Sequence, residues 1–248
     1  MNDPVIAVIP ARYASTRFPG KALAELCGKP MIQHVYEKAQ ASRADLVVVA
    51  TDHELIKTKV ESFGGRAVMT SPDHPSGTDR IFEAIQGLPG DIVINLQGDE
   101  PLLPTSVIDA LIELMQNRPD CPMATVAVPA PRARLADSNI VKVVRGADGQ
   151  ALYFSRAPIP FLRDGGTEMP LYQHWGIYAY RRRTLARFVA LPPSPLENCE
   201  KLEQLRALEN GIPIQVLLSR LSSIGVDTPA DLAAAEALMK QQRLEANR

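Results

Sequence analysis

Short apolar runs alternate with helical patterns through the first half of the chain, and this alternation limits the possible folds more than any other feature. The runs cover residues 5–9, 46–51, 66–69 and 92–96. Runs this short and continuously apolar are typical of parallel strands buried on both faces. The sequence therefore predicts βαβ units and an α/β fold with a mainly parallel sheet.

Helical patterns lie between and after these runs. Pro30 suits a first helical turn, and the apolar stripe behind it consists of Met31, Ile32, Val35, Tyr36 and Ala39. Further helices are expected after Asp52 and after Asp79. Near the end of the chain we predict one helix over residues 197–210, closed by Gly211, and a last helix capped by Thr228.

The middle of the chain has a different character. Residues 140–144 and 151–154 are apolar runs on either side of Asp148-Gly149, a turn pair that favours an antiparallel hairpin. We therefore predict one domain over residues 1–248, with an antiparallel insertion at approximately 121–180.

Composition excludes several classes of protein. Lys and Arg number 27 against 28 Asp and Glu, so the chain has no overall field that would attract nucleic acid or an anionic membrane. The three cysteines lack metal-binding spacing, which favours a reducing compartment, and we expect a cytoplasmic protein. The apolar runs are far shorter than the roughly 20 residues of a membrane helix.

A long basic loop follows the first predicted strand. Residues 10–21 read PARYASTRFPGK, with cations at Arg12, Arg17 and Lys21 and a hydroxyl at Ser15. Loops at the carboxyl ends of strands line the ligand crevice in open α/β sheets, and such a loop suits a polyphosphate. The alternative is an ordinary solvated loop. The dinucleotide and P-loop glycine patterns are absent.

Two other segments add polar groups. SGTDR at residues 76–80 is a small-residue turn that opens a helix, where backbone donors can meet a base or an anion, although a plain capped helix start explains it equally well. NLQGDEP at residues 95–101 places Asp99 after a buried strand, where a carboxylate suits Mg²⁺. Asp227 is the candidate second carboxylate, with helix capping as its alternative role.

The remaining motifs lie in the second half. Arg156 follows a hairpin strand and could grip a carboxylate with two hydrogen bonds. Along the segment HWGIYAY, strand alternation puts His174, Tyr178 and Tyr180 on one face, a pattern that core packing would also produce.

These ordered motifs, from residue 9 to residue 227, resemble those of the CMP-Kdo synthetases (3-deoxy-manno-octulosonate cytidylyltransferases), which share the basic loop with the CMP-sialate synthetases. The resemblance implies a three-layer nucleotide-diphospho-sugar transferase fold. It assigns the triphosphate to Arg12, Ser15, Arg17 and Lys21, the cytosine pocket to Ser76, Gly77 and Arg80, and Mg²⁺ to Asp99 and Asp227. It also implies that the sugar acid contacts Gln97, Arg156, His174, Tyr178, Glu203 and Gln204. Trp175 and Ala22 depart from the residues expected at their positions.

The resemblance implies a complete reaction. CMP would pass from CTP to the anomeric 2-hydroxyl of the sugar acid Kdo, with Lys21, Arg12 and Asp99 as catalytic residues and His174 as an alternative base. The product would serve lipopolysaccharide synthesis, and the antiparallel insertion would form a homodimer. Acceptors such as 8-amino-Kdo or a sialic acid stay open, as does a nucleotide-sensing binding protein without enzymatic activity.

Overall fold

The computed structural model describes residues 4–14, 18–163, 169–221 and 223–246. The chain divides into two compact units, Met1–Asp109 with Ser222–Arg248, and Ala110–Leu221. The predicted insertion at residues 121–180 falls inside the second unit. Helix α4 (Thr105–Asn117) contains the boundary.

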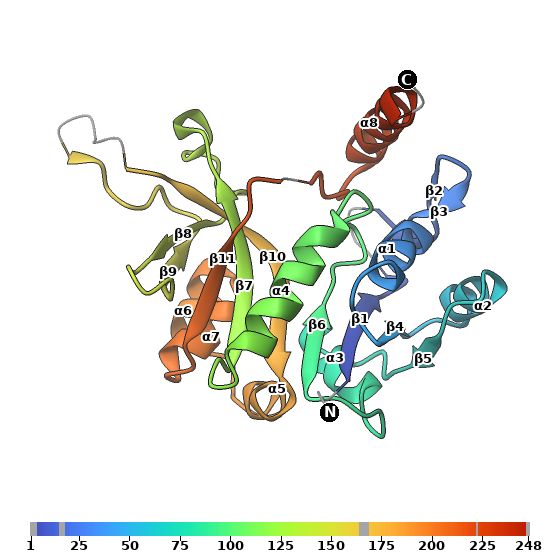
Figure 1. Ribbon diagram of the computed structural model, residues 1–248, viewed down its shortest axis with the longest axis horizontal. Helices are drawn as coiled ribbons and strands as arrows, with labels where there is room; N and C mark the ends of the chain where they lie inside the picture. Colours follow the sequence, from blue (N-terminus) through green and yellow to red (C-terminus); the bar gives the residue numbers. More distant parts are fainter. Residues whose placement is uncertain (1–3, 15–17, 164–168, 222, 247–248) are drawn as a thin grey trace. The chain divides into compact units, whose positions relative to one another are not determined.

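The first unit is built on a parallel sheet (Figure 1). Its strands are β1 (Val5–Ala11), β4 (Leu46–Thr51), β5 (Ala67–Met69) and β6 (Ile92–Asn95). They lie in the order β6-β1-β4-β5, with β1 parallel to both of its neighbours. The four predicted strands are confirmed, each within two residues at either end. Because the strands are parallel, their carboxyl ends meet at one edge of the sheet.

Helices cover both faces of this sheet. Right-handed crossovers carry the chain outward through α1 (Met31–Gln40) and α2 (Glu54–Ser62), and then back past β1 through α3 (Gly77–Ala84). Because β6 lies on the other side of β1 from β4, a crossover of the same hand places α3 on the face opposite α1 (Figure 1). The predicted place of Pro30 in α1 is wrong by one residue. Its extended backbone makes it the residue before the helix and the end of β3 (Lys29–Pro30).

A small hairpin and the last helix complete the first unit. The hairpin joins β2 (Glu25–Leu26) to β3 through Cys27 and Gly28, both at positive φ, as a two-residue turn requires. Thr228 begins α8 (Pro229–Ala246) as predicted, because its hydroxyl and Asp231 cap each other's backbone N–H groups. Leu26, Met31, Val226 and Ala235 form one buried cluster that ties α8 to the hairpin.

The second unit contains the antiparallel strands. They are β7 (Met123–Pro129), β8 (Lys142–Arg145), β9 (Ala151–Ser155), β10 (Tyr172–Arg181) and β11 (Ile214–Leu218). β7 pairs antiparallel with β10 and parallel with β11, while β8 pairs antiparallel with both β9 and β10. The predicted hairpin is therefore confirmed as β8–β9, with Gly149 at positive φ in its turn.

The predicted single helix over residues 197–210 is wrong. Three helices follow β10: α5 (Arg182–Val189), α6 (Pro195–Glu200) and α7 (Gln204–Glu209). Lys201 adopts a left-handed conformation that ends α6, and the N–H of Leu202 closes that end on the carbonyl of Glu197. Gly211 ends α7 at positive φ, as expected. No helix in the described part of the chain has both the length and the apolarity to cross a membrane.

Candidate active site

A cavity of about 360 Å³ lies in the first unit, at the carboxyl ends of β1 and β6. The residues predicted from the sequence that line it are Arg12, Lys21, Ser76, Gly77, Arg80, Gln97, Asp99 and Asp227. Ser15 and Arg17, also predicted to face the triphosphate, lie outside the described residues. The structure thus brings the basic loop, the SGTDR turn and both proposed metal ligands to one cavity.

Local backbone geometry places Lys21 in this cavity. The loop after β1 turns back where the N–H of Gly20 donates to the carbonyl of Tyr13 over 3.2 Å. Gly20 has φ 68°, a left-handed conformation that glycine adopts without strain, and the short helix η1 (Lys21–Leu23) starts directly after it. The turn directs Lys21 back toward the sheet edge, while Arg12 stays exposed on the cavity wall.

Two carboxylates converge on the Lys21 ammonium. Its Nζ lies 2.5 Å from Oδ2 of Asp99 and 3.2 Å from Oδ1 of Asp227. Asp99 follows β6, whereas Asp227 precedes α8, and a backbone hydrogen bond of 2.8 Å from the N–H of Val226 to the carbonyl of Asp99 joins the two loops. Because Thr228 caps α8, the alternative capping role considered for Asp227 is filled by its neighbour.

The donor set of this pair fits a hard divalent cation. The carboxylates of Asp99 and Asp227 both bind one positive group, the ammonium of Lys21. Mg²⁺ prefers one or two carboxylates and completes its shell with substrate phosphate oxygens and water. Among the described residues, no group of three or more His, Cys, Asp or Glu side chains is arranged so that it could hold a metal ion.

The SGTDR turn forms another wall of the cavity. Ser76 caps α3, since its hydroxyl oxygen accepts from the N–H of Thr78 at 3.1 Å and that of Asp79 at 3.3 Å. The same hydroxyl donates to Oδ2 of Asp79 over 2.7 Å. Its hydrogen-bonding capacity is therefore largely used within the turn, which leaves backbone groups of the turn as the contacts for a ligand. A Cβ on Gly77 would lie 3.4 Å from the ring of Pro10, at ordinary van der Waals contact, so this wall lies close to β1.

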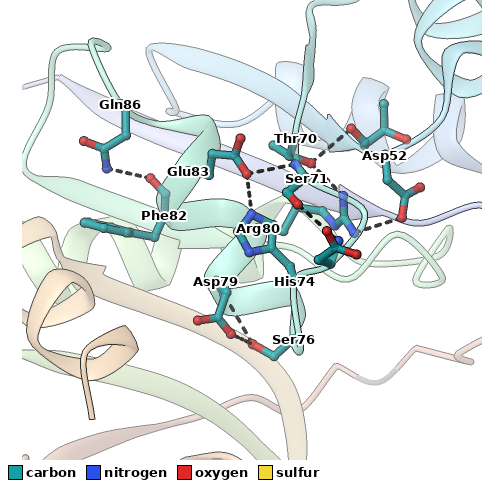
Figure 2. Close-up of polar contacts among 12 residues, drawn as sticks. Asp52, Thr70, Ser71, His74, Ser76, Asp79, Arg80, Phe82, Glu83 and Gln86 are labelled. Carbon is teal, nitrogen blue, oxygen red and sulfur yellow. Dashed lines mark hydrogen bonds and ion pairs between the residues drawn. The ribbon is translucent and has the colours of Figure 1, made fainter. Parts of the chain in front are cut away.

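Arg80 is held from behind the cavity, as Figure 2 shows. Its guanidinium donates to Oγ1 of Thr70 over 2.6 Å and to Oδ2 of Asp52 over 2.9 Å. The residue is only 3% exposed. Its charge is thus offset by the carboxylate of Asp52, which follows β4. Arg80 therefore stabilises the turn and is already paired when a ligand enters the cavity.

His74 and Glu83 were not predicted from the sequence. His74 lines the cavity two residues before Ser76, and its Nε2 forms a short contact with Glu83 on α3 (Figure 2). Glu83 also accepts from the N–H of Ser71 over 2.9 Å. The hydrogen bond from the Ser71 backbone, and to a smaller extent the one with His74, lower the pKa of Glu83. The carboxylate therefore anchors the segment that leads into the SGTDR turn.

The predicted acceptor residues, apart from Gln97, belong to the second unit. His174 and Tyr178 share one face of β10, with ring centroids 5.5 Å apart, and Tyr180 continues that face 5.9 Å from Tyr178. Burial, and then the charge of Glu203, raise the pKa of Tyr178. Gln204 is 4% exposed, and its Nε2 has no hydrogen-bond partner within the described ranges. Three of the predicted residues thus form one polar group in the second unit, in which His174 is buried while Tyr178 and Glu203 are partly exposed.

Arg156 follows the hairpin strand β9, as predicted, and its guanidinium donates to backbone carbonyls. Its Nε donates to the carbonyl of Glu200 over 2.8 Å, and its Nη2 approaches the carbonyl of Lys201 at 3.4 Å. Its Nη1 donates to the carbonyl of Ser138 over 3.0 Å. Carbonyls at the end of a helix lack intrahelical partners, so the guanidinium caps α6. Arg156 therefore has a structural task besides any ligand contact.

The parallel sheet, its covering helices and the cavity of cations and carboxylates at its carboxyl edge define a nucleotide-binding transferase. A family model described as Cytidylyltransferase matches residues 6–216. The chain belongs to the 3-deoxy-manno-octulosonate cytidylyltransferase family, and the predicted family and fold class are confirmed.

Named relatives cover nearly the whole chain. A 3-deoxy-manno-octulosonate cytidylyltransferase of Syntrophobacter fumaroxidans is 50% identical and matches 98% of this chain and 99% of its own length. An 8-amino-3,8-dideoxy-manno-octulosonate cytidylyltransferase of a Shewanella species is 52% identical over 94% of this chain and 97% of its own.

Solved structures agree with this assignment. A CMP:2-keto-3-deoxy-manno-octonic acid synthetase complexed with CTP has a TM-score of 0.93 and 45% identity, covering 96% of this chain and 99% of that one. A cytidylyltransferase from Leptospira borgpetersenii, 18% identical over 96% of this chain and 87% of that one, shares the fold with a TM-score of 0.63.

Proposed function

We propose that the chain transfers CMP from CTP to the anomeric 2-hydroxyl of Kdo, releasing pyrophosphate and forming CMP-Kdo. The observation that carries the proposal is the single cavity in which Lys21, Asp99 and the SGTDR turn meet. The Kdo cytidylyltransferases among its relatives, and the related synthetase complexed with CTP, support the same choice of nucleotide and sugar acid.

The cations of the basic loop would bind the triphosphate. Lys21 and Arg12 line the cavity from the loop after β1, and the backbone of the turn that starts at Ser76 lies on the opposite segment of the wall. Charge that develops on the phosphate oxygens would be stabilised by groups already in place, which is the main way such transfers are accelerated. Lys21 is the best placed cation for this work.

Asp99 and Asp227 are the residues that would hold Mg²⁺. Such an ion, when bound, would neutralise phosphate charge and lower the pKa of a coordinated hydroxyl. The two carboxylates would orient it at the sheet edge, because the bond between Val226 and Asp99 keeps their loops together. Lys21 would exchange its carboxylate contacts for phosphate oxygens as the nucleotide enters.

The sugar acid would contact the polar group of the second unit that His174, Tyr178 and Glu203 form. His174 and Tyr178 on β10, with Glu203 and Gln204 around the start of α7, offer donors and acceptors for several hydroxyls. Since His174 has a pKa lowered to about 3 by burial, it would act as a hydrogen-bonding group more readily than as a base at neutral pH.

Pyrophosphate release tests this function. The purified protein is given CTP and Mg²⁺ with Kdo, 8-amino-Kdo or N-acetylneuraminate, and a reaction without acceptor is the control. Release with Kdo supports the proposal. Release with 8-amino-Kdo alone would move the assignment to the activity named for the Shewanella relative, and no release with any acceptor would revive a nucleotide-binding role.

We also propose a cytoplasmic homodimer that supplies activated Kdo for lipopolysaccharide. The side chains of Leu152 and Phe161 in the second unit are 64% and 89% exposed, which supports a partner on the antiparallel part of the chain. Light scattering after gel filtration tests the dimer. A wild-type monomer at micromolar concentration would exclude it, and Phe161→Glu should shift a dimer toward monomer.

A further inference from the structure

Thr125 lies in the middle of β7, where the neighbouring strand β10 is irregular. Trp175 is paired with Val126, but the next pair joins Tyr178 to Thr125, so the residues at 176 and 177 have no partner on β7. This irregularity brings the carbonyl of Ile177 within 2.8 Å of the Thr125 hydroxyl. The carbonyl of Trp175 is 3.4 Å from the same hydroxyl.

The third neighbour of this hydroxyl is the imidazole of His174. Its Nε2 lies 2.9 Å from Oγ1 of Thr125. A threonine hydroxyl has one proton, and a carbonyl oxygen can only accept. The proton therefore goes to the carbonyl of Ile177, and the hydroxyl oxygen accepts from the ring. This arrangement requires a hydrogen atom on Nε2 of His174.

We propose that Thr125 is a positioning residue that holds His174 in the neutral tautomer protonated at Nε2, which leaves the lone pair on Nδ1. A neutral histidine has one donor and one acceptor nitrogen, and the bond made by one nitrogen decides the role of the other. Within the described residues, the hydrogen bond that fixes the ring is the one between Nε2 and Oγ1 of Thr125.

The surroundings of the ring favour its neutral form. His174 is 9% exposed, and the ring of Phe154 meets it edge-on with centroids 4.9 Å apart. Tyr178 is the titratable group beside it, and Glu203 is the acid that acts on Tyr178. Burial lowers the pKa of His174 to about 3, so the ring carries no charge near neutral pH.

This tautomer defines what His174 offers to a ligand, and the consequence rests on the function proposed above. Nδ1 can accept a hydrogen bond from a hydroxyl of a sugar acid, but it cannot donate one to the carboxylate. His174 would thus recognise the acceptor by accepting a hydrogen bond from one of its hydroxyl groups. Thr125, which is fully buried, would act through His174.

Nitrogen NMR of the wild-type protein tests the tautomer directly. Histidine labelled with ¹⁵N gives distinct shifts for protonated and unprotonated ring nitrogens, and the spectrum of His174→Gln identifies the signals of His174. We expect protonated Nε2 and unprotonated Nδ1 between pH 6 and pH 8. A ring protonated at Nδ1, or at both nitrogens, overturns the proposal. This measurement needs neither turnover nor a substituted Thr125.

Two variants then test the action of Thr125. Thr125→Val keeps the shape but removes the acceptor, so the preference for protonated Nε2 should disappear and kcat/KM for Kdo should fall by about 10- to 100-fold, while KM for CTP stays constant. Thr125→Ser should restore both. Thr184→Val, at a threonine of the same unit that is 6% exposed, is the control for loss of a buried hydroxyl.

The possible outcomes separate the two proposals. If Thr125→Val folds and keeps the wild-type tautomer, or if Thr125→Ser behaves like Thr125→Val, the positioning role is wrong. If the wild-type protein transfers CMP to none of the sugar acids, the proposed function fails, while the tautomer measurement still decides the role of Thr125.

Discussion

Lys21 donates through Nζ to Oδ2 of Asp99 over 2.5 Å, so the main cation of the cavity is bound to the main candidate metal ligand. The second carboxylate, Asp227, lies 3.2 Å from the same nitrogen. Without Lys21, the two carboxylates would lose the ammonium that lies between them. A lysine in this place competes with any metal ion for the pair.

The substitution Lys21→Met should therefore tighten the binding of divalent cations in the absence of nucleotide, while it weakens catalysis. We expect Mn²⁺ to bind about tenfold more tightly by calorimetry, and pyrophosphate release to fall by at least about 100-fold. Lys29→Met is the control, because Lys29 pairs with Glu37 on the surface at 2.7 Å. Unchanged or weaker Mn²⁺ binding in Lys21→Met would contradict the competition.

Asp99→Asn should abolish most turnover and leave the fold intact. An amide keeps the shape of the side chain but binds Mg²⁺ poorly, so the expected loss in pyrophosphate release is at least about 100-fold. Asp120→Asn, at an exposed position after α4, should retain wild-type activity. Full activity of Asp99→Asn at ordinary magnesium concentrations would remove Asp99 from the metal assignment.

The ion pair of Asp52 and Arg80 should contribute strongly to stability because it is largely buried. The side chains are 12% and 4% exposed, respectively. Asp52→Asn leaves the guanidinium without its charged partner, and we expect the free energy of unfolding to fall by about 3 kcal/mol in urea titrations. The double variant Asp52→Asn with Arg80→Met should lose less than the two single losses combined.

A surface pair provides the comparison for that cycle. Lys57 and Glu54 lie one turn apart on α2 at 3.3 Å, and the Glu54 side chain is 67% exposed. Removal of this surface ion pair should change the unfolding free energy by less than about 0.5 kcal/mol. Equal costs for the two pairs would mean that Arg80 is not held by its charge partner.

Arg156→Ala should destabilise the protein as well as any acceptor binding. The guanidinium donates to the carbonyls of Glu200 and Lys201 at the end of α6, so its removal should lower the unfolding free energy by about 1 kcal/mol. We expect KM for Kdo to rise more than KM for CTP. A variant with wild-type stability would refute the capping role, and equal changes in both KM values would refute the carboxylate contact.

His174 should make the stability of the protein depend on pH. Its pKa falls from the ordinary 6.5 to about 3 on folding, so the unfolded chain binds a proton that the folded chain rejects. The stabilising contribution is complete above about pH 6.5 and is lost as the pH falls toward 3, by at most about 1.4 kcal/mol per pH unit. Urea titrations of the wild type and His174→Gln from pH 7 to pH 4 should diverge in slope, and parallel profiles would contradict this.

The parallel strands could be predicted because local and tertiary preferences agree. The segment that forms β4 is apolar up to its last residue, Thr51, and it is a strand of the predicted length, Leu46–Thr51. The basic loop and the carboxylates were also predictable, because parallel strands gather their carboxyl ends at one edge and Asp99 follows such a strand. Asp52 obeys the same rule after β4 and could have been identified by it.

Other features depend on contacts that a local pattern does not contain. The segment over residues 197–210 has good helix formers at Lys201 and Leu202, yet the helix breaks there. Arg156, 45 residues away in sequence from Lys201, binds the carbonyls that a continuous helix would use. Thr125 gives no signal at all, because a threonine inside a strand is ordinary. Its role arises only from the irregular pairing of β10.

The backbone hydrogen bond between Val226 and Asp99 has a consequence for the synthesis of the chain. Asp227 lies 206 positions after Lys21 in the sequence. The hydrogen bond from the N–H of Val226 to the carbonyl of Asp99 holds its loop at the cavity. A ribosome-bound chain that has already released the basic loop and the SGTDR turn still lacks this carboxylate. If Asp227 holds the metal as proposed, a nascent chain completes the cation site only after residue 227 has left the ribosome, so shorter chains would not consume CTP.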